Sequence, residues 1–492
     1  MTAVQTGLVW QSARQLNQAI RAGTLSAAEL MAVAYDQIER LNPKVNAIVN
    51  LLPRDEALAV ARARDQARAR GEGGGPLCGL PLAVKDLEDA ESFPTTFGFR
   101  PFAGAVAKAD GEVTARMRQA GAIVIGKTNV PEFGLGSNTF NALFGATCNP
   151  YDLERTAGGS SGGAAAALAT GMLAVADGSD MGGSLRNPAA FCNVVGFRPS
   201  MGRVPGHRAY GWLARLSTIG PMARNVGDAA LLLSVQSGYC ATDPLSRMEP
   251  GAEFGGSLDC DPRTLRVALS DDLGGLPVQP QVRERVNQAG TVFADLGAEV
   301  EQACPNLDGA MAVFQAQRAA GLAALGKQLD RQVPDWRRYA KDTAVWNIER
   351  GLSLTADELI GAEIERTQIY RDAARFFERY DVLLCPAAQV TPFPIGDEWV
   401  REINGQPMAT YIDWMAVCCT ITVLAAPAIS VPGGFTPAGG FTPEGLPVGL
   451  QIVGAPGQDL KVLQAARLFE QATGHGKIRP PIVEKQLAPQ AE

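Results

Sequence analysis

Short apolar runs alternate with amphipathic segments through most of the chain. Residues 80–84 form an apolar run of strand length, and residues 111–120 after it have the apolar spacing of a helix. The same strand–helix order recurs at residues 265–269 and 282–296. It predicts an α/β fold in which a mixed, mostly parallel central sheet is covered by helices on both faces. Further strands are predicted at residues 122–126, 193–197, 381–385, 428–431 and 447–453, and further helices at residues 226–237 and 459–473.

Ser26 and Glu29 form a capping box, which predicts a helix that begins there and ends near Asn42–Pro43. Residues 54–70 are predicted to be an exposed helix whose alternating charges face solvent. Residues 308–380 have helical patterning without a strand signal, and we expect them to form an insertion at the substrate entrance. Because no linker separates two halves, residues 1–492 are interpreted as one domain.

Composition narrows the classes of function. The chain has 492 residues, of which 46% are hydrophobic and 19% charged, as in a globular protein with a large core. Its net charge of −7 gives no electrostatic case for nucleic acid. The uncharged residues 157–176 have the length of a membrane span, but their glycines and serines favour a loop and a buried helix. We therefore expect no membrane insertion.

The cysteines and histidines narrow the chemistry further. The nine cysteines are scattered and include no Cys-x-x-Cys, which is typical of free thiols in a reducing compartment. With no secretory leader at the N-terminus, a cytoplasmic location is predicted. His207 and His475 are the only histidines, so a histidine-ligated metal centre is difficult to build.

Two glycine–serine clusters are the strongest candidates for chemistry. Ser160 and Ser161 lie between the glycine pairs 158–159 and 162–163, and Ser184 follows a second glycine pair at 182–183. Glycine lets the backbone approach a ligand closely, and main-chain N–H groups exposed in such turns bind anions and oxyanions. The pattern indicates two loops of one active site.

These loops allow three interpretations. A phosphate-binding Walker loop requires a lysine that residues 158–163 lack. An α/β-hydrolase elbow, G-x-S-x-G, would make Ser160 the nucleophile with His207 or His475 as its base. The third interpretation uses a lysine as base, and Lys85 at the end of a buried strand suits it because desolvation favours the neutral amine. A structural alternative for Lys85 is an ion pair with Asp86.

The chain resembles the amidase signature family, strongly over residues 77–221 and less at its ends. The resemblance rests on blocks whose order and spacing agree with the family. Many relatives carry threonine at the position of Ser179 and isoleucine at that of Leu185, which are mild departures. The blocks are Leu-Ala-Val-Lys85-Asp, Gly126-Lys-Thr-Asn-Val-Pro-Glu132-Phe, Gly-Gly-Ser160-Ser-Gly-Gly, Gly-Ser-Asp180-Met-Gly-Gly-Ser184-Leu-Arg186-Asn-Pro and Val-Gly-Phe-Arg-Pro-Ser-Met-Gly-Arg203-Val.

The resemblance implies a Ser–cis-Ser–Lys triad. Ser184 would attack the carbonyl carbon, and Ser160, after a cis peptide bond, would relay the proton to neutral Lys85. The main-chain N–H groups of Met181, Gly182 and Gly183 would form the oxyanion hole. Side chains at the two glycines would block the approach of the carbonyl.

The resemblance also implies supporting residues. Asp180 and Arg186 would support the nucleophile loop, and Ser161 would either hydrogen-bond Lys85 or cap the following helix. Gly134 would approach the acyl part of the substrate. Arg203 would either reach the pocket mouth or pair with an acid.

The implied activity is hydrolysis of non-peptide carbon–nitrogen bonds in aryl or small acyl amides, with esters and carbamates (urethanes) as further small-molecule substrates. No cofactor or metal is implied, no nucleic-acid or membrane partner is expected, and the chain would be a monomer or a homodimer. Two alternatives remain. One is the glutamine-amidase subunit of a tRNA-dependent amidotransferase, and the other is an inactive family member that serves as a binding protein.

Overall fold

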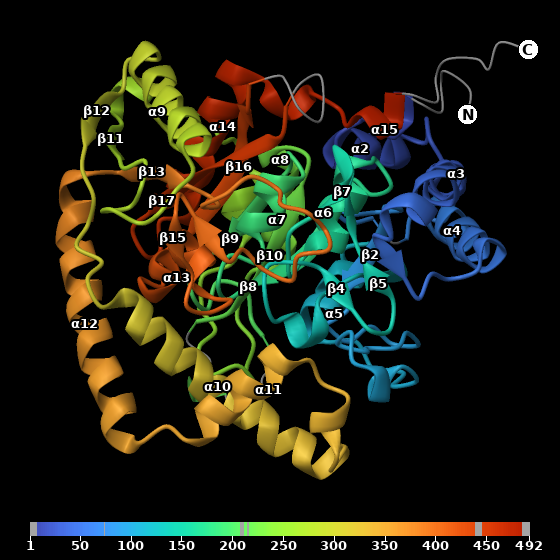
Figure 1. Ribbon diagram of the computed structural model, residues 1–492. Coiled ribbons are helices and arrows are strands. Elements are labelled where there is room, and N and C mark those ends of the chain that lie inside the picture. The colour runs from blue at the N-terminus through green and yellow to red at the C-terminus, as the bar shows by residue number, and fades with distance from the viewer. Residues whose placement is uncertain (1–6, 73, 207–210, 214–215, 438–444, 485–492) are drawn as a thin grey trace, which may run out of the picture.

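The computed structural model describes residues 7–72, 74–206, 211–213, 216–437 and 445–484, which fold into an α/β structure around a mixed sheet (Figure 1). In the described residues this sheet has eight strands in the order β12-β11-β13-β17-β16-β9-β10-β8. The predicted fold class is confirmed. The strands are β8 Val175–Asp180, β9 Val195–Arg198, β10 Thr218–Ala223, β11 Arg266–Leu269, β12 Glu299–Gln302, β13 Val382–Pro386, β16 Ala428–Phe435 and β17 Pro447–Gly454.

The expected predominance of parallel strands is corrected by the pairing. Only β11 forms parallel pairs within the described sheet, with β12 and β13, whereas the other neighbouring strands are antiparallel. β8, which the sequence does not predict, runs in the same direction as β9. β10 follows β9 in the chain and inserts between these two strands, antiparallel to both. β17 inserts between β13 and β16 in the same way.

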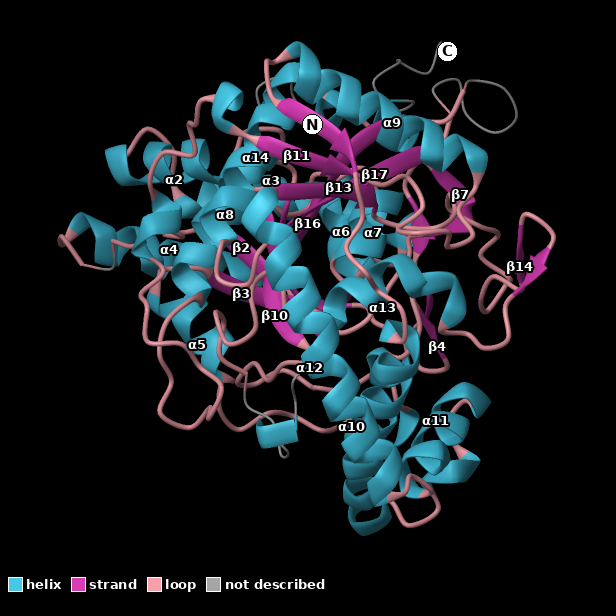
Figure 2. Ribbon diagram, turned by 90° about the vertical axis from the view of Figure 1, so that its left-hand side faces the viewer, coloured by secondary structure: helices cyan, strands magenta, loops and turns pink. Residues whose placement is uncertain are grey.

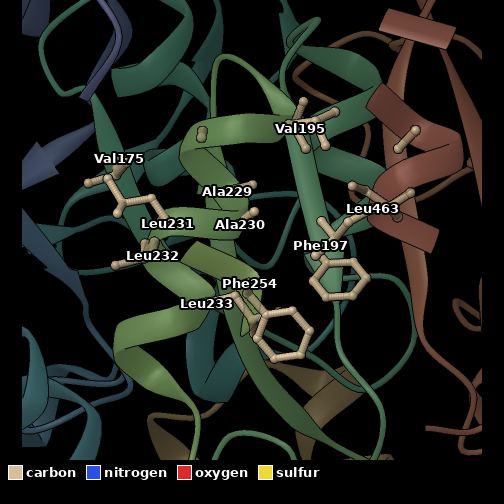
Figure 3. Close-up of a cluster of buried hydrophobic side chains, with 14 of the residues drawn as sticks. Val175, Val195, Phe197, Ala229, Ala230, Leu231, Leu232, Leu233, Phe254 and Leu463 are labelled. Carbon is tan, nitrogen blue, oxygen red and sulfur yellow. The ribbon is translucent and has the colours of Figure 1, made fainter. Parts of the chain in front are cut away.

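Helices cover both faces of the sheet because alternate strand residues point to opposite sides. In β13, Leu384 joins the core under α8, α9 and α14, whereas Leu383 and Cys385 join the core next to α7 and α13. Figure 3 shows part of the first core, where Ala229 and Ala230 of α8 lie toward β9, which carries Val195 and Phe197, and Leu231 lies toward Val175 of β8. The covering helices are α6 Gly162–Ala169, α7 Arg186–Phe191, α8 Val226–Gln236, α9 Pro280–Asp295, α13 Ala416–Val423 and α14 Asp459–Thr473.

A smaller sheet lies beside β8 and carries Lys85. β2 (Pro81–Lys85) and β3 (Ile123–Thr128) are parallel, and α5 (Glu112–Gln119) forms the crossover between them. β1 (Ile48–Val49) pairs antiparallel with β3. The C-terminal end of β2 therefore delivers Lys85 into the interior.

The N-terminal helices are α2 (Ala13–Ala22), α3 (Ala27–Val45) and α4 (Arg54–Ala69). The predicted capping box at Ser26 is confirmed, but α3 continues through Pro43. Proline removes one backbone donor, and in the last turn the remaining bond from Asn46 N–H to Asn42 O still closes the helix.

The predicted helical character of residues 308–380 is confirmed. α10 (Ala310–Gln332), α11 (Asp342–Leu352) and α12 (Ala356–Arg379) follow one another, and α10 and α11 extend beyond the sheet (Figures 1 and 2). In residues 157–176 the helix is limited to α6, because the chain enters β8 at Val175. Among the described residues, no helix is both long and apolar enough to cross a membrane. The remaining short elements are β4 Phe140–Asn141, β5 Gly145–Ala146, β6 Cys148–Asn149, β7 Asp152–Thr156, β14 Glu402–Ile403, β15 Gln406–Pro407 and α15 Pro481–Glu484.

Candidate active site

Lys85 lies at the centre of a cluster of serine hydroxyls. It is the last residue of β2 and has no exposed surface. Its Nζ lies 2.9 Å from Ser160 Oγ, 2.7 Å from Ser161 Oγ and 3.0 Å from Ser179 Oγ. Ser161 makes no side-chain cap to α6, so the structure favours its contact with Lys85 over the capping alternative.

Asp86 next to Lys85 takes part in a different ion pair. Its carboxylate lies 3.8 Å from Lys127 Nζ and accepts hydrogen bonds from the main-chain N–H and the hydroxyl of Thr96. Burial raises the pKa of Asp86 and lowers the pKa of Lys127. The ion-pair partner of Asp86 is therefore Lys127 and not Lys85. β3 places Lys127 beside β2.

Asp177 in β8 fixes the backbone at Lys85. Its Oδ1 accepts the Lys85 main-chain N–H at 3.0 Å, while Oδ2 is buried without a hydrogen-bond partner among the described residues. Burial raises the pKa of Asp177 to about 6, although the hydrogen bond and the charges of Lys127 and Lys85 oppose the shift.

The loop before α6 places Ser160 beside Lys85. The Gly159–Ser160 peptide bond is cis. A Cβ atom at Gly159 would lie 3.0 Å from the main-chain nitrogen of Asn138, and one at Gly162 would lie 2.3 Å from Thr139 Oγ1. These glycines are therefore required by the tight contact between the loop and residues 137–139.

Asp180 holds the loop around Ser184 from both sides. Its carboxylate accepts the main-chain N–H of Gly183 at 2.9 Å and that of Leu185 at 3.1 Å. The Ser161 N–H donates to Ser184 O at 3.2 Å, which connects the two serine loops. Ser184 is 8% exposed, whereas Lys85 is 0% exposed. Ser184 is thus the more accessible of the two.

Two buried arginines neutralise Asp180. Arg186 donates to both carboxylate oxygens, at 3.0 and 2.8 Å, and Arg198 Nη1 lies 3.4 Å from Oδ1. Burial alone would raise the pKa of Asp180, but the charges and hydrogen bonds of Arg186 and Arg198 hold it well below its usual range. Asp180 and Arg186 therefore lie against the Ser184 loop, and their supporting role stays a prediction.

The glycine pair before Ser184 is constrained by what lies behind the loop. A Cβ atom at Gly183 would lie 2.5 Å from Asn187 Nδ2 and 2.7 Å from Cys418 Cβ, and its φ is +104°. A Cβ atom at Gly182 would lie 3.1 Å from Phe314. Packing therefore requires glycine at position 183, in addition to the expected access of a carbonyl group, and leaves little room for a side chain at position 182. The Gly183 N–H already donates to Asp180, which distinguishes it from the other two expected oxyanion donors.

The two expected substrate-contact residues have different surroundings. At Gly134, with φ +70°, a Cβ atom would lie 3.5 Å from Ser160 Oγ, so this residue borders the serine cluster. Arg203 is buried and pairs with Asp459 at 3.3 Å. The structure therefore favours the ion-pair alternative for Arg203.

Sequence reasoning missed three contributors. Ser179 is only a mild departure from the family pattern, and no motif of the sequence includes Asp177, although the alternation of β8 places both on the side that faces Lys85. Arg318 of α10 reaches Met181 Sδ at 3.5 Å and donates to Tyr411 OH at 2.8 Å. No local pattern relates α10 to residue 181, so only the fold reveals this contact.

The histidine-based alternative finds no support in the described residues. His475 lies in a short 3₁₀ helix next to Gly434 and Phe469, where burial lowers its pKa. His207 lies outside the described residues. All nine cysteines are free, and no group of three or more histidine, cysteine or acidic side chains in the described part of the chain could hold a metal ion.

Comparison with known proteins gives a consistent result. The profile of the family described as Amidase matches residues 29–463. A glutamyl-tRNA(Gln) amidotransferase subunit from Moorella thermoacetica is 34% identical, covering 96% of this chain and 99% of its own. The acylamidase of Rhodococcus erythropolis is 33% identical, covering 95% and 96%. The crystal structure of a bacterial aryl acylamidase of the amidase signature family superimposes with a TM-score of 0.88 at 30% identity, covering 95% of this chain and 98% of that one.

Proposed function

The chain belongs to the Amidase family of amidase signature enzymes, and on this basis we propose that it is a serine hydrolase of carboxylic amides with Ser184 as nucleophile. The contact that carries the proposal is the 2.9 Å separation of Lys85 Nζ and Ser160 Oγ. It places a buried amine beside a hydroxyl, as a lysine-based proton relay requires.

In the proposed first half-reaction, Ser184 Oγ attacks the carbonyl carbon as its proton passes to Ser160 and the Ser160 proton passes to neutral Lys85. The C–N bond then breaks, and the leaving nitrogen takes the proton back from Lys85 through Ser160. This leaves an acyl-Ser184 intermediate and a free amine or ammonia. Water attacks the ester by the same relay and releases the carboxylic acid.

The oxyanion of the tetrahedral intermediate would be bound by the main-chain N–H groups of Met181 and Gly182. The Gly183 N–H, the third expected donor, is held by Asp180 at 2.9 Å. We therefore propose that Gly183 shapes the loop and does not bind the oxyanion. Asp180 holds the main chain on either side of Ser184 in place.

We propose aryl or small acyl amides as substrates, with esters and carbamates as further candidates. The similarity to the aryl acylamidase structure and to the Rhodococcus acylamidase supports this class. The similarity to the Moorella amidotransferase protein supports a second candidate, a glutaminase that works within a complex. A purified chain that hydrolyses anilides without a partner would favour the first, whereas glutamine hydrolysis that requires a partner protein would favour the second.

The nucleophile is tested by intact-mass measurement after treatment with a fluorophosphonate. We expect one adduct on the wild type, none on Ser184→Ala and slow labelling of Lys85→Ala. The control variant His475→Ala should label like the wild type. An adduct that persists on Ser184→Ala and disappears from His475→Ala would overturn the lysine mechanism and favour Ser160 as nucleophile.

A further inference from the structure

A cavity lies away from the serine cluster, between the segment before α2 and the segment after α14. Its volume is about 430 Å³, and its walls include Trp10 and Ser12 before α2 and Lys477 and Arg479 after α14. Figure 1 shows α2 and α15 side by side in this region. Such a volume lies within the range of small-molecule sites.

Three cations in the wall of this cavity contact no acidic side chain of the described residues. The guanidinium carbons of Arg224 and Arg479 lie 5.7 and 4.4 Å from the ring centre of Trp10. Arg224 donates to the carbonyl groups of Gln11 and Leu173. Within the described residues, no carboxylate lies within 4.0 Å of a side-chain nitrogen of Arg224, Lys477 or Arg479.

The acidic residue in the wall is already neutralised. Glu470 lies 2.5 Å from Arg467 and also accepts the Val226 main-chain N–H at 2.8 Å. It is therefore not available to balance the other cations of the wall, although the whole chain has a net charge of −7. Burial is the main cause that lowers the pKa of Arg224 to about 10; the charge of Asp228 opposes this shift, and the charge of Arg479 adds to it. At neutral pH the Arg224 guanidinium still keeps its charge.

We propose that this cavity binds a small organic anion with at least two negative charges, either a phosphate ester or a di- or tricarboxylate. Such groups accept charge-assisted hydrogen bonds from guanidinium and ammonium groups. The ring of Trp10 lies within cation–π distance of Arg224 and Arg479. Because these arginines occupy its surroundings, we expect the anion to be recognised by its charge and not by stacking on the indole.

The cavity is separate from the proposed amide site. Ala169 in its wall is the last residue of α6, whereas Ser161 precedes the first residue. The helix has eight residues, so the two sites lie at opposite ends of a segment about 12 Å long. An anion in this cavity would therefore not occupy the position of the amide substrate.

Isothermal titration of the full chain with citrate and with inorganic phosphate tests the proposal, with sodium chloride of matched ionic strength as reference. The double variant Lys477→Gln/Arg479→Gln removes two exposed cations from the wall. Its matched control, Lys327→Gln/Arg331→Gln on α10, removes the same charge outside the cavity. We expect the wild type and the control to bind at least one probe, and the cavity variant to bind it at least about tenfold more weakly.

The order of the two probes distinguishes the ligand classes. Tighter binding of phosphate supports a phosphate ester, and tighter binding of citrate supports a polycarboxylate. The proposal is overturned if neither probe binds the wild type with a dissociation constant below about 1 mM. It is also overturned if both double variants lose affinity equally, because binding would then follow net charge alone. Unchanged thermal unfolding of the cavity variant controls for its folding.

Discussion

Replacing Asp177 by asparagine should stabilise the fold at neutral pH. The Asp177 carboxylate is fully buried, and its Oδ2 has no hydrogen-bond partner among the described residues. Burial raises its pKa from 3.8 to about 6. Asparagine keeps an oxygen for the Lys85 N–H, which Oδ1 now accepts at 3.0 Å, and removes the charge.

The size of the stability gain follows from the pKa values of Asp177 in the unfolded and in the folded chain. Between pH 3.8 and about 6 the folded chain holds the proton on Asp177 while the unfolded chain releases it. The folded state binds more protons in this window, so the free energy of unfolding falls as the pH rises. The separation of about two pH units corresponds to about 3 kcal/mol at pH 8. Roughly half of this loss develops between pH 5 and pH 8.

Urea unfolding at several pH values between 5 and 8 measures this effect. We expect the stability gain of Asp177→Asn over the wild type to increase across this range. Asp308→Asn, at an exposed aspartate after β12, controls for the loss of one negative charge. A difference between Asp177→Asn and the wild type that stays constant from pH 5 to pH 8 would refute the reasoning, because the buried carboxylate would then not titrate in this window.

The other predictions concern the two serine loops. Ser161→Ala removes the 2.7 Å contact to Lys85 and should lower kcat for an anilide at least about tenfold. The free energy of urea unfolding should fall by no more than about 1.5 kcal/mol. An unchanged kcat would contradict a role for Ser161 beside Lys85. Gly183→Ala places a Cβ atom 2.5 Å from a neighbouring side chain at φ +104°, and it should destabilise the fold by about 1–3 kcal/mol and slow fluorophosphonate labelling. Arg186→Met leaves Asp180 with a single arginine, and urea unfolding should show a loss of about 3–5 kcal/mol in the free energy of unfolding. A stability equal to that of the wild type would show that Asp180 does not need the charge of Arg186.

Many of the elements and most of the serine cluster follow from the local sequence, but β8, β10 and β12 do not. An apolar run that ends in Lys85 predicts a buried strand with the amine at its end, and β2 has that form. Glycine pairs around Ser160 and Ser184 predict tight loops, and the contacts at Gly159 and Gly183 explain why no larger residue fits. These features depend on a few consecutive residues, so they can be read from the chain. The catalytic roles and the single domain stay predictions.

Tertiary structure determined how the elements pair and which side chains meet. Strand order could not be inferred because β10 and β17 insert between strands that precede them in the chain. The resemblance leaves two roles for Arg203, at the pocket mouth or in an ion pair, and only the position of α14 pairs it with Asp459. Ser179 reaches Lys85 because β8 lies beside β2. The pattern of apolar and polar residues determines which face of an element is buried. The partner of a buried polar group, in contrast, is often far away in the chain, and only the folded structure brings the two within hydrogen-bond distance.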